Sequence, residues 1–324
     1  ELEFLYNFCK DKTVLELGSM VGMSSYVIAH VAKQIHCVDA WDDSFNHLHE
    51  DDRQIDVYTN DWLAQTTPPN MLESFKKNCE GFLSSNKMTM TQGWTQNVAH
   101  LFEKESYDVL FIDADHSRKG VTRDIVKYYH TIKTGSPIIF HDYACGHWHG
   151  VTQAVHAADI IKRLEFKNCV DIGCAKGFLV HALRLLGADA WGEDISDYAL
   201  DSCYPKVKDY LSPPTDKKYD LLICKDVLEH VEEEDLPEFL TYLLSKGEQF
   251  FFVIPLGDDD FFRIREYEVD VTHVTKKDEE WWLQLLDKAG YKLVEFSYTF
   301  GSVKEKWTKP FPYGNGFFIL EKRK

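Results

Sequence analysis

The sequence has few of the features that mark fibrous, low-complexity or membrane-spanning chains. Its 324 residues include only 18 Gly and 10 Pro, which excludes collagen-like and low-complexity classes. No apolar run approaches the ~18–20 residues that a membrane helix needs. Residues 1–12 lack a basic flank followed by an apolar stretch, so we expect no secretory signal. These absences predict a globular, cytoplasmic chain without a membrane partner.

Basic residues are outnumbered throughout the chain. There are 36 Lys and Arg against 53 Asp and Glu, which gives a formal net charge of −17. Residues 1–158 carry 13 basic and 21 acidic residues, and residues 159–324 carry 23 and 32. Because a nucleic-acid-binding surface needs clustered, phosphate-neutralising Lys and Arg, nucleic acid is not expected as the main partner. Only scattered Lys and Arg within residues 304–324 make a locally basic stretch.

The eight cysteines also lack a pattern. No pair has C-x-x-C spacing, so a zinc ribbon or a thioredoxin-type site has no support. Most of them lie in apolar segments that are typical of strands or helices. We therefore predict buried free thiols in a reducing compartment.

One pattern occurs twice. Its first copy, TVLELGSMVG at residues 13–22, is an apolar run with an acid and a Gly-x-x-x-Gly turn, followed by a helical stretch and an apolar run that ends on Asp39. The second copy, CVDIGCAKG at residues 169–177, has the same order and leads to Glu193 and Asp194. Each copy is followed by a further strand that begins Tyr-Asp, by a helix, and by another apolar strand.

Continuous apolar strands that alternate with helices predict parallel sheets buried on both faces. The predicted fold class is α/β, with two tandem, doubly wound domains at residues 1–158 and 159–324. The second domain has two more predicted strands, at residues 291–300 and 316–322. We expect the first domain to lack this last strand pair.

The spacing of the glycines indicates the kind of ligand. Nicotinamide-binding domains use Gly-x-Gly-x-x-Gly to approach a pyrophosphate, and the middle glycine is missing here. An acid precedes each turn, Glu16 in one and Asp171 in the other; it would repel a phosphate but suits an ammonium group. An adenosine with an amino-acid side arm fits. Asp39 and Asp194, at the ends of the second strands, can accept hydrogen bonds from a ribose diol.

These residues resemble the class I S-adenosylmethionine-dependent methyltransferases, whose domains are Rossmann-like. The resemblance covers both halves and implies S-adenosylmethionine as the cofactor, with the turn at its methionine end and the second-strand acid at its ribose. The implied cofactor-binding residues are Glu16, Gly18, Gly22, Asp39 and Gly93 in the first domain, and Asp171, Gly173, Gly177 and Asp194 in the second.

Residues 108–143 resemble a subgroup of metal-dependent, small-molecule and sugar O-methyltransferases. The resemblance implies that Asp113, His141 and Asp142 bind Mg²⁺, which would orient an acceptor hydroxyl and lower its pKa. Many relatives have a carboxylate or amide where His141 stands; histidine also suits Mn, Fe or Zn, or can act as a general base. The alternative is that both acids cap helices. His116 is a rival base.

Residues 225–240 (KDVLEHVEEEDLPEFL) resemble a broad group of metal-independent methyltransferases. Asp113, His141 and His230 are the candidate catalytic residues of the two halves, although His230 equally suits capping or packing. His273 is a candidate for facing the acceptor, and so are His147 and His149 in the first half, where a surface loop is the alternative.

The sequence therefore predicts a tandem methyltransferase that acts on a hydroxyl of a small molecule or glycan, with homo-oligomerisation open. One alternative is a single catalytic domain beside a degenerate one. Another is a non-catalytic, nucleoside-binding protein. The missing middle glycine disfavours an NAD-dependent oxidoreductase.

Overall fold

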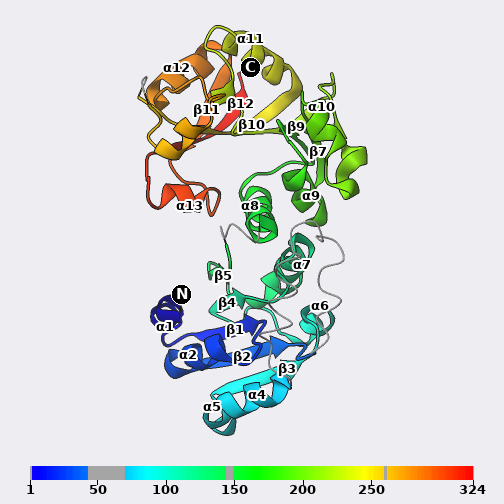
Figure 1. The fold of residues 1–324 in the computed structure, drawn as a ribbon, viewed down its shortest axis with the longest axis vertical. Coiled ribbons are helices and arrows are strands. Elements are labelled where there is room, and N and C mark those ends of the chain that lie inside the picture. The colour runs from blue at the N-terminus through cyan, green and yellow to red at the C-terminus, as the bar shows by residue number, and fades with distance from the viewer. Residues whose placement is uncertain (1, 43–69, 144–148, 259–260, 324) are drawn as a thin grey trace. The chain divides into compact units, whose positions relative to one another are not determined.

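The computed structural model describes residues 2–42, 70–143, 149–258 and 261–323. The chain divides into two compact units, residues 1–152 and 153–324. Each unit has its own sheet (Figure 1). The division falls within helix α8 (His149–Arg163), slightly before the boundary expected from the sequence.

The first unit is built on a five-stranded parallel sheet with the order β3-β2-β1-β4-β5. Its strands are β1 (Thr13–Leu17), β2 (Gln34–Asp39), β3 (Met88–Gln92), β4 (Val109–Ile112) and β5 (Ile138–Phe140). Its helices are α1 (Leu2–Phe8), α2 (Met23–Val31), α4 (Met71–Asn78), α5 (Glu80–Ser84), α6 (Thr95–Val98), η2 (Ala99–Leu101), α7 (Arg118–Tyr128) and η3 (Tyr129–Thr131).

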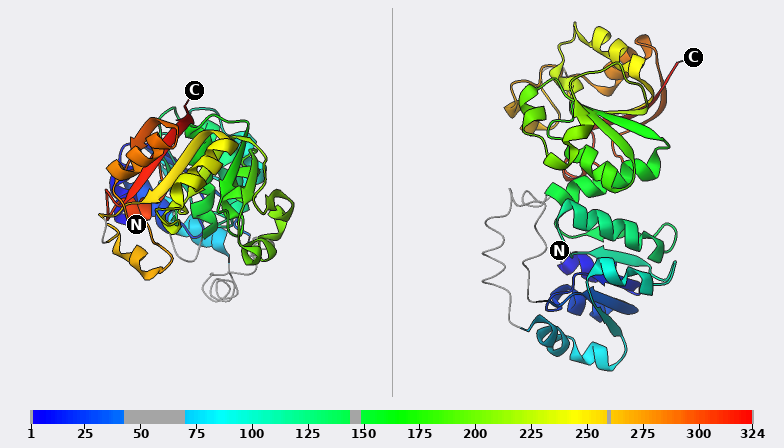
Figure 2. Two further views of the ribbon diagram at one scale, coloured as in Figure 1. Left: turned by 90° about the horizontal axis from the view of Figure 1, so that it is seen from above. Right: turned by 90° about the vertical axis from the view of Figure 1, so that its right-hand side faces the viewer.

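The core of the first unit follows from the apolar strands. Val14 and Phe111 pack with Ile28 of α2 and Phe75 of α4 in one buried cluster. Helices α4 and α5 lie next to each other, and α5 lies against β3 (Figure 2, cyan). Helix α7 begins after Ser117, whose hydroxyl accepts a hydrogen bond from the amide of the third helical residue.

The second unit has a seven-stranded sheet with the order β11-β12-β10-β9-β6-β7-β8. Strand β12 (Asn315–Lys322) is antiparallel to both of its neighbours, and the other pairs are parallel. The other strands are β6 (Asn168–Ile172), β7 (Asp189–Glu193), β8 (Leu211–Ser212), β9 (Tyr219–Lys225), β10 (Gly247–Pro255) and β11 (Tyr291–Ser297). The helices are α9 (Phe178–Leu185), α10 (Asp197–Asp201), η4 (Pro205–Tyr210), η5 (Leu228–His230), α11 (Leu236–Lys246), η6 (Arg265–Val269), α12 (Glu279–Lys288) and α13 (Glu305–Thr308).

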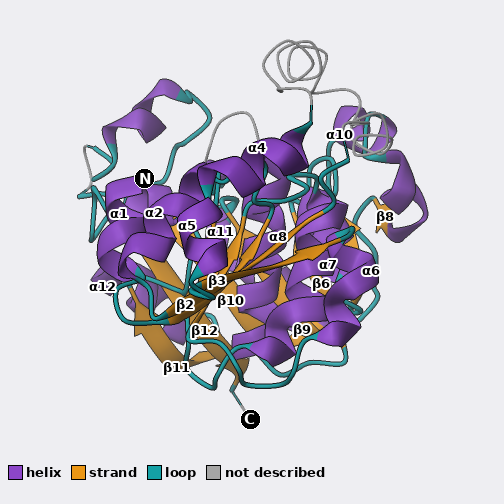
Figure 3. Cartoon of the chain, turned by 90° about the horizontal axis from the view of Figure 1, so that it is seen from below, coloured by secondary structure: helices purple, strands orange, loops and turns teal. Residues whose placement is uncertain are grey.

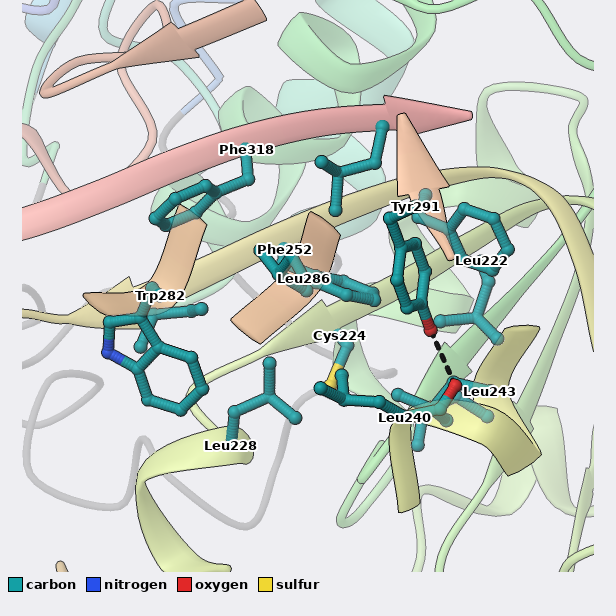
Figure 4. Packing of buried hydrophobic residues seen from close by; sticks show 14 of the residues in the cluster. Leu222, Cys224, Leu228, Leu240, Leu243, Phe252, Trp282, Leu286, Tyr291 and Phe318 are labelled. Carbon is teal, nitrogen blue, oxygen red and sulfur yellow. Dashed lines mark hydrogen bonds between the residues drawn. The ribbon is translucent and has the colours of Figure 1, made fainter. Parts of the chain in front are cut away.

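This sheet is buried on both faces, as its continuous apolar strands predict. Alternate residues of β10 divide between two clusters: Phe250 and Phe252 pack with Trp282, whereas Phe251 packs with Ile160 of α8. Figure 3 colours the helices purple and the strands orange, and Figure 4 shows the first of these clusters, in which the Tyr291 hydroxyl donates to the Leu240 carbonyl at 2.7 Å.

The seven cysteines in the described part of the chain are free and buried, as their apolar surroundings predict. The eighth, Cys145, lies outside the described residues. Among the described helices, none has the length and apolar character needed to cross a membrane.

A buried ion pair lies at the end of β7. The Lys246 ammonium contacts both carboxylate oxygens of Glu193, at 2.7 and 2.9 Å, and both side chains are 2% exposed. Thr215 and the Tyr242 hydroxyl complete the surroundings of the carboxylate. Because both charges are out of water, each depends on the other for compensation.

We predict that Lys246→Met lowers the free energy of unfolding of the second unit by about 3–5 kcal/mol, because it leaves Glu193 as an unpaired buried charge. Urea denaturation measures the loss. Lys292→Met is the control. It removes the pair between Lys292 and Glu321, whose side chains are 63% and 44% exposed, and changes stability by about 1 kcal/mol or less. Equal effects of the two variants would contradict the assignment.

A second buried acid belongs to α7. Asp124 is 1% exposed and accepts a hydrogen bond from the Thr95 hydroxyl at 2.6 Å. Burial raises the pKa of the Asp124 carboxyl to about 7, although the Thr95 hydrogen bond opposes the shift. The folded chain therefore binds more protons than the unfolded chain between pH 3.8 and about 7, and the stability of the first unit falls as the pH rises through this window.

Asp124→Asn removes this dependence because an amide does not ionise. As the pH rises from about 5 to about 8, we expect the unfolding free energy of the variant to increase relative to that of the parent chain by on the order of a few kcal/mol. Denaturant titrations at several pH values measure the gain. Asp108, whose pKa is lowered by the hydrogen bond from Lys133, is the control. Asp108→Asn should change the unfolding free energy by the same amount at about pH 5 and at about pH 8. A parallel pH profile for Asp124→Asn would refute the prediction.

Candidate active sites of the two units

The two glycine turns have the same backbone conformation. In each, the first, third and fifth residues have positive φ: 87°, 48° and 86° for Gly18, Met20 and Gly22, and 70°, 47° and 73° for Gly173, Ala175 and Gly177. The first glycine of each turn donates its amide to the carbonyl of the residue before the second-strand acid, over 2.8 Å in both units. The sequence repeat is therefore a repeat of geometry at the carboxyl ends of β1 and β6.

The second-strand acids hold these turns in place. Asp39 accepts hydrogen bonds from the amides of Ser19 and Met20 at 2.9 and 2.8 Å, and from that of Trp41 at 2.7 Å. A carboxylate offers about four acceptor positions, so about one remains for a ligand.

Asp194 does the same in the second unit. It accepts from the amides of Ala175 at 2.7 Å and Ser196 at 2.8 Å. It therefore keeps about two acceptor positions for a ligand. Gly93, the predicted adenine-side residue of the first unit, donates its amide to the Asp39 carbonyl at 2.8 Å, so the structure brings it beside the turn.

The acids that precede the turns differ between the units. Glu16 is fully buried and accepts hydrogen bonds from three serine hydroxyls, those of Ser19 (2.8 Å), Ser24 (2.6 Å) and Ser25. Burial raises its pKa, and these hydrogen bonds oppose the rise. A direct contact between Glu16 and a ligand ammonium would require the serines to release it.

Asp171 is 6% exposed, and its carboxylate accepts no hydrogen bond from the residues that the structure describes. Burial raises its pKa to about 7, against the opposing charge of Lys225. The second unit thus has the more available acid at this position.

Four side chains from the ends of β4 and β5 meet in the first unit. His141 Nδ1 lies 3.0 Å from an oxygen of Asp113 and 3.0 Å from an oxygen of Asp142. His116 joins them: its Nε2 lies 3.0 Å from Asp113, and its Nδ1 lies 3.6 Å from Asp142. The structure therefore brings together the three predicted metal ligands and adds the rival base.

Burial would lower the pKa of His141, but the carboxylates of Asp113 and Asp142 raise it to about 11. An imidazolium between two carboxylates supplies one positive charge where a divalent cation would supply two. Two carboxylates and two imidazoles form a mixed oxygen and nitrogen donor set, which suits Mn, Fe or Zn as well as Mg.

Asp115 accepts a hydrogen bond at 2.9 Å from the amide of Ser117, the N-cap of α7. His147 lies outside the described residues, and His149 is described only as the first residue of α8.

The second unit has a different cluster at the end of β9. Asp226, at positive φ, is held by the ammonium groups of Lys225 and Lys304, which keep its pKa low although burial opposes them. Lys304 is itself buried and also donates to the Tyr267 hydroxyl at 2.8 Å and to the Asn315 side-chain oxygen at 2.9 Å.

Next to this ion pair, Glu229, His230 and His273 form a second group whose ligand atoms lie within 4.8 Å of one another. Glu229 is 1% exposed, and neither carboxylate oxygen has a hydrogen-bond partner in the described chain. Burial, followed by the charge of Asp226, raises its pKa to about 8. Such a group is unusual, because buried polar atoms normally have a partner.

The two histidines are oriented by backbone carbonyls. His273 Nδ1 lies 2.7 Å from the Tyr267 carbonyl oxygen, and His230 Nδ1 lies 3.2 Å from the Thr272 carbonyl oxygen and 2.9 Å from its hydroxyl. A carbonyl can only accept, so each Nδ1 donates, and in the neutral ring each Nε2 keeps its lone pair.

Sequence reasoning singled out His230 and His273 but missed Glu229, Asp226 and Lys304. The spacing Asp-x-x-Glu-His directly after a buried strand was the available signal for the first two. Lys304 carried none, because it enters from a segment near the end of the chain.

Parallel α/β sheets that carry an acid-anchored glycine turn between the first strand and the first helix define a class: the class I S-adenosylmethionine-dependent methyltransferases. Family profiles described as "Methyltransferase domain" match this chain twice, over residues 15–143 and over residues 148–296. The chain therefore belongs to this class and carries two of its domains in tandem.

Individual relatives are distant. A probable tRNA (uracil-O(2)-)-methyltransferase of Caenorhabditis briggsae is 26% identical over 180 residues, which are 52% of this chain and 30% of that protein. A ubiquinone biosynthesis O-methyltransferase of Nitrosomonas europaea is 31% identical over 88 residues, or 23% of this chain and 37% of that protein. The chain thus spans about a third of the length of these curated relatives.

Solved structures cover about half of the chain. An S-adenosylmethionine-dependent methyltransferase from Archaeoglobus fulgidus has a TM-score of 0.42 at 18% identity, covering 52% of this chain and 94% of that one. Magnesium protoporphyrin IX methyltransferase from Synechocystis, with bound S-adenosylhomocysteine, has a TM-score of 0.41 at 18% identity and covers 54% and 83%.

The glycines of the two turns tolerate a side chain differently. A Cβ on Gly18 would lie 2.1 Å from the backbone oxygen of Asp113, whereas one on Gly173 would lie 2.5 Å from a methyl group of Val227. At each glycine, the place where a Cβ would lie is therefore already occupied by another part of the same unit. Gly135 and Gly187 also have positive φ but have no atom within 4 Å of such a Cβ.

We predict that Gly18→Ala removes one of two S-adenosylhomocysteine equivalents in calorimetry, because backbone cannot move aside, and that Gly173→Ala weakens the other site by about tenfold or more. Gly135→Ala and Gly187→Ala are the controls, since they introduce similar backbone strain without the contact. If the controls lose as much affinity, the close approach is not the reason for the glycines.

Proposed function

We propose that the chain transfers the methyl group of S-adenosylmethionine to a hydroxyl oxygen of an organic acceptor. The observation that supports this most is the repeated pairing of an acid-anchored glycine turn with a cluster of histidine and carboxylate side chains at the same edge of each sheet. Both relatives named above are, by their printed names, methyltransferases that act on oxygen. Positioning for in-line attack supplies much of the acceleration when the methyl donor is already a sulfonium.

The cofactor fits the residues present in each unit. In the first, Gly18, Gly22 and Asp39 would hold it, with Gly93 beside Asp39 and with Asp113 also at this edge. In the second, Asp171 would meet its ammonium group, with Gly173, Gly177 and Asp194 beside it. Bound S-adenosylmethionine supplies an activated methyl group, and the chain holds and orients it.

A divalent cation fits both clusters. In the first unit Asp113, His141 and Asp142 would hold it, with His116 beside them. In the second, Glu229, His230 and His273 would hold it, because a buried carboxylate without a hydrogen-bond partner in the described chain and two imidazoles offer ligand atoms within 4.8 Å of one another there. A bound cation would orient the acceptor hydroxyl and lower its pKa. This departs from the metal-independent chemistry expected for the second half.

The prediction is two Mn²⁺ equivalents per chain, measured by calorimetry or by the loss of the free-ion resonance signal. Asp113→Asn should remove one, Glu229→Gln the other, and both variants should keep their S-adenosylhomocysteine sites. Glu233→Gln, which replaces a half-exposed acid near the same cluster, is the control and should keep both equivalents. An unchanged Mn²⁺ count in Glu229→Gln would remove the second site from the proposal.

The main alternative is a single catalytic unit beside a degenerate one. The internal use of Glu16 by three serines favours the second unit as the catalytic one in that case. Calorimetry distinguishes the two readings, because a degenerate unit would leave one S-adenosylhomocysteine equivalent per chain instead of two.

A further inference from the structure

Residues 269–274, which contact the group of Glu229, His230 and His273, expose apolar side chains to solvent. Val269 is 84% exposed, Val271 is 90% exposed, and Val274 is 38% exposed. Between them, Thr272 contacts His230, His273 lies with its ring centre 4.6 Å from that of His230, and the Val274 amide donates to the Glu229 carbonyl at 2.8 Å. The segment that carries these valines therefore borders the proposed acceptor-activating group.

The charges around this group are mostly negative. The two stretches that border it, residues 231–235 and 265–278, contain eight acidic and three basic residues. Glu232, Glu234 and Asp270 are exposed to solvent. A polyanionic acceptor would meet repulsion at this edge.

The basic side chains nearby are engaged with acids. Lys276 pairs with Glu268 at 2.5 Å, and Lys277 pairs with Glu233 at 2.8 Å. Lys225 and Lys304 are committed to Asp226. Arg265 is exposed, but one guanidinium cannot replace the cluster of bases that a nucleic-acid backbone requires.

We infer that the acceptor of the second unit is an uncharged phenol or alcohol with an apolar body, which the exposed valines contact while its hydroxyl lies at Glu229, His230 and His273. This inference rests on the proposed function and names the substrate class of the same site. The acids around the site disfavour phosphorylated and polynucleotide acceptors through like-charge repulsion, and the exposed valines offer apolar surface to an uncharged one.

The experiment uses the full chain and a series of 4-alkylphenols of increasing chain length as probes, with binding followed by calorimetry. Each methylene that leaves water should raise the affinity by up to about fourfold. Val271→Asp should flatten this dependence. Val294→Asp, at a half-exposed valine of strand β11, is the matched control and should leave it unchanged.

Three outcomes would overturn the inference: an affinity independent of alkyl length, an equal loss in Val294→Asp, or tighter binding of bulk tRNA or of an alkylammonium probe than of the phenols. S-adenosylhomocysteine and Mn²⁺ binding are measured on the same samples. If both persist while the alkylphenols fail, only the acceptor class is wrong. If the affinity of the alkylphenols rises with alkyl length but their oxygen receives no label from methyl-tritiated S-adenosylmethionine, the proposed function fails instead.

Discussion

Both candidate sites depend on the contact between a glycine turn and the acid that ends the neighbouring strand. Asp39 and Asp194 accept hydrogen bonds from backbone amides of the turns. Without these carboxylates, the amides would need water as their acceptor. Positive φ at three positions in each turn makes this contact possible, since the amides must point towards the second strand. Because parallel strands end at the same edge of a sheet, fixing this turn also fixes what the ends of the later strands can meet.

The two units use that shared frame for different electrostatics. In the first, Glu16 is hydrogen-bonded by serine hydroxyls of the same unit, and Asp113, His141 and Asp142 form a cluster of ion pairs at the strand ends. In the second, Asp171 has no hydrogen-bonded partner among the described residues, and a lysine from a later segment compensates Asp226. The side chains at the strand ends therefore differ between the units, while the backbone conformation of the turn is the same.

Two acids of the second unit are compensated by lysines. Lys246 compensates Glu193, and Lys304 compensates Asp226. The Glu229 carboxylate has no hydrogen-bond partner in the described chain, although it lies near Asp226. Burying a carboxylate without compensation is strongly unfavourable, so proteins keep such groups where a ligand or a proton completes them. This contrast is what separates the Glu229 group from the structural ion pairs around it.

The sequence by itself determined the α/β class, the tandem repeat, the glycine turns and the strand-end acids, because these follow from local patterns: continuous apolar runs, Gly-x-x-x-Gly spacing and an acid after each second strand. It also singled out Asp113, His141 and Asp142, since consecutive parallel strands deliver their ends to one edge. Only the tertiary structure decided that Glu16 accepts hydrogen bonds from three serines, that Asp115 accepts one from the Ser117 amide, and that Lys304 compensates Asp226 from 78 residues away. The physical reason is that hydrogen bonding and charge compensation depend on which side chains meet in space, and a side chain from a distant segment leaves no local signal of the partner it will find.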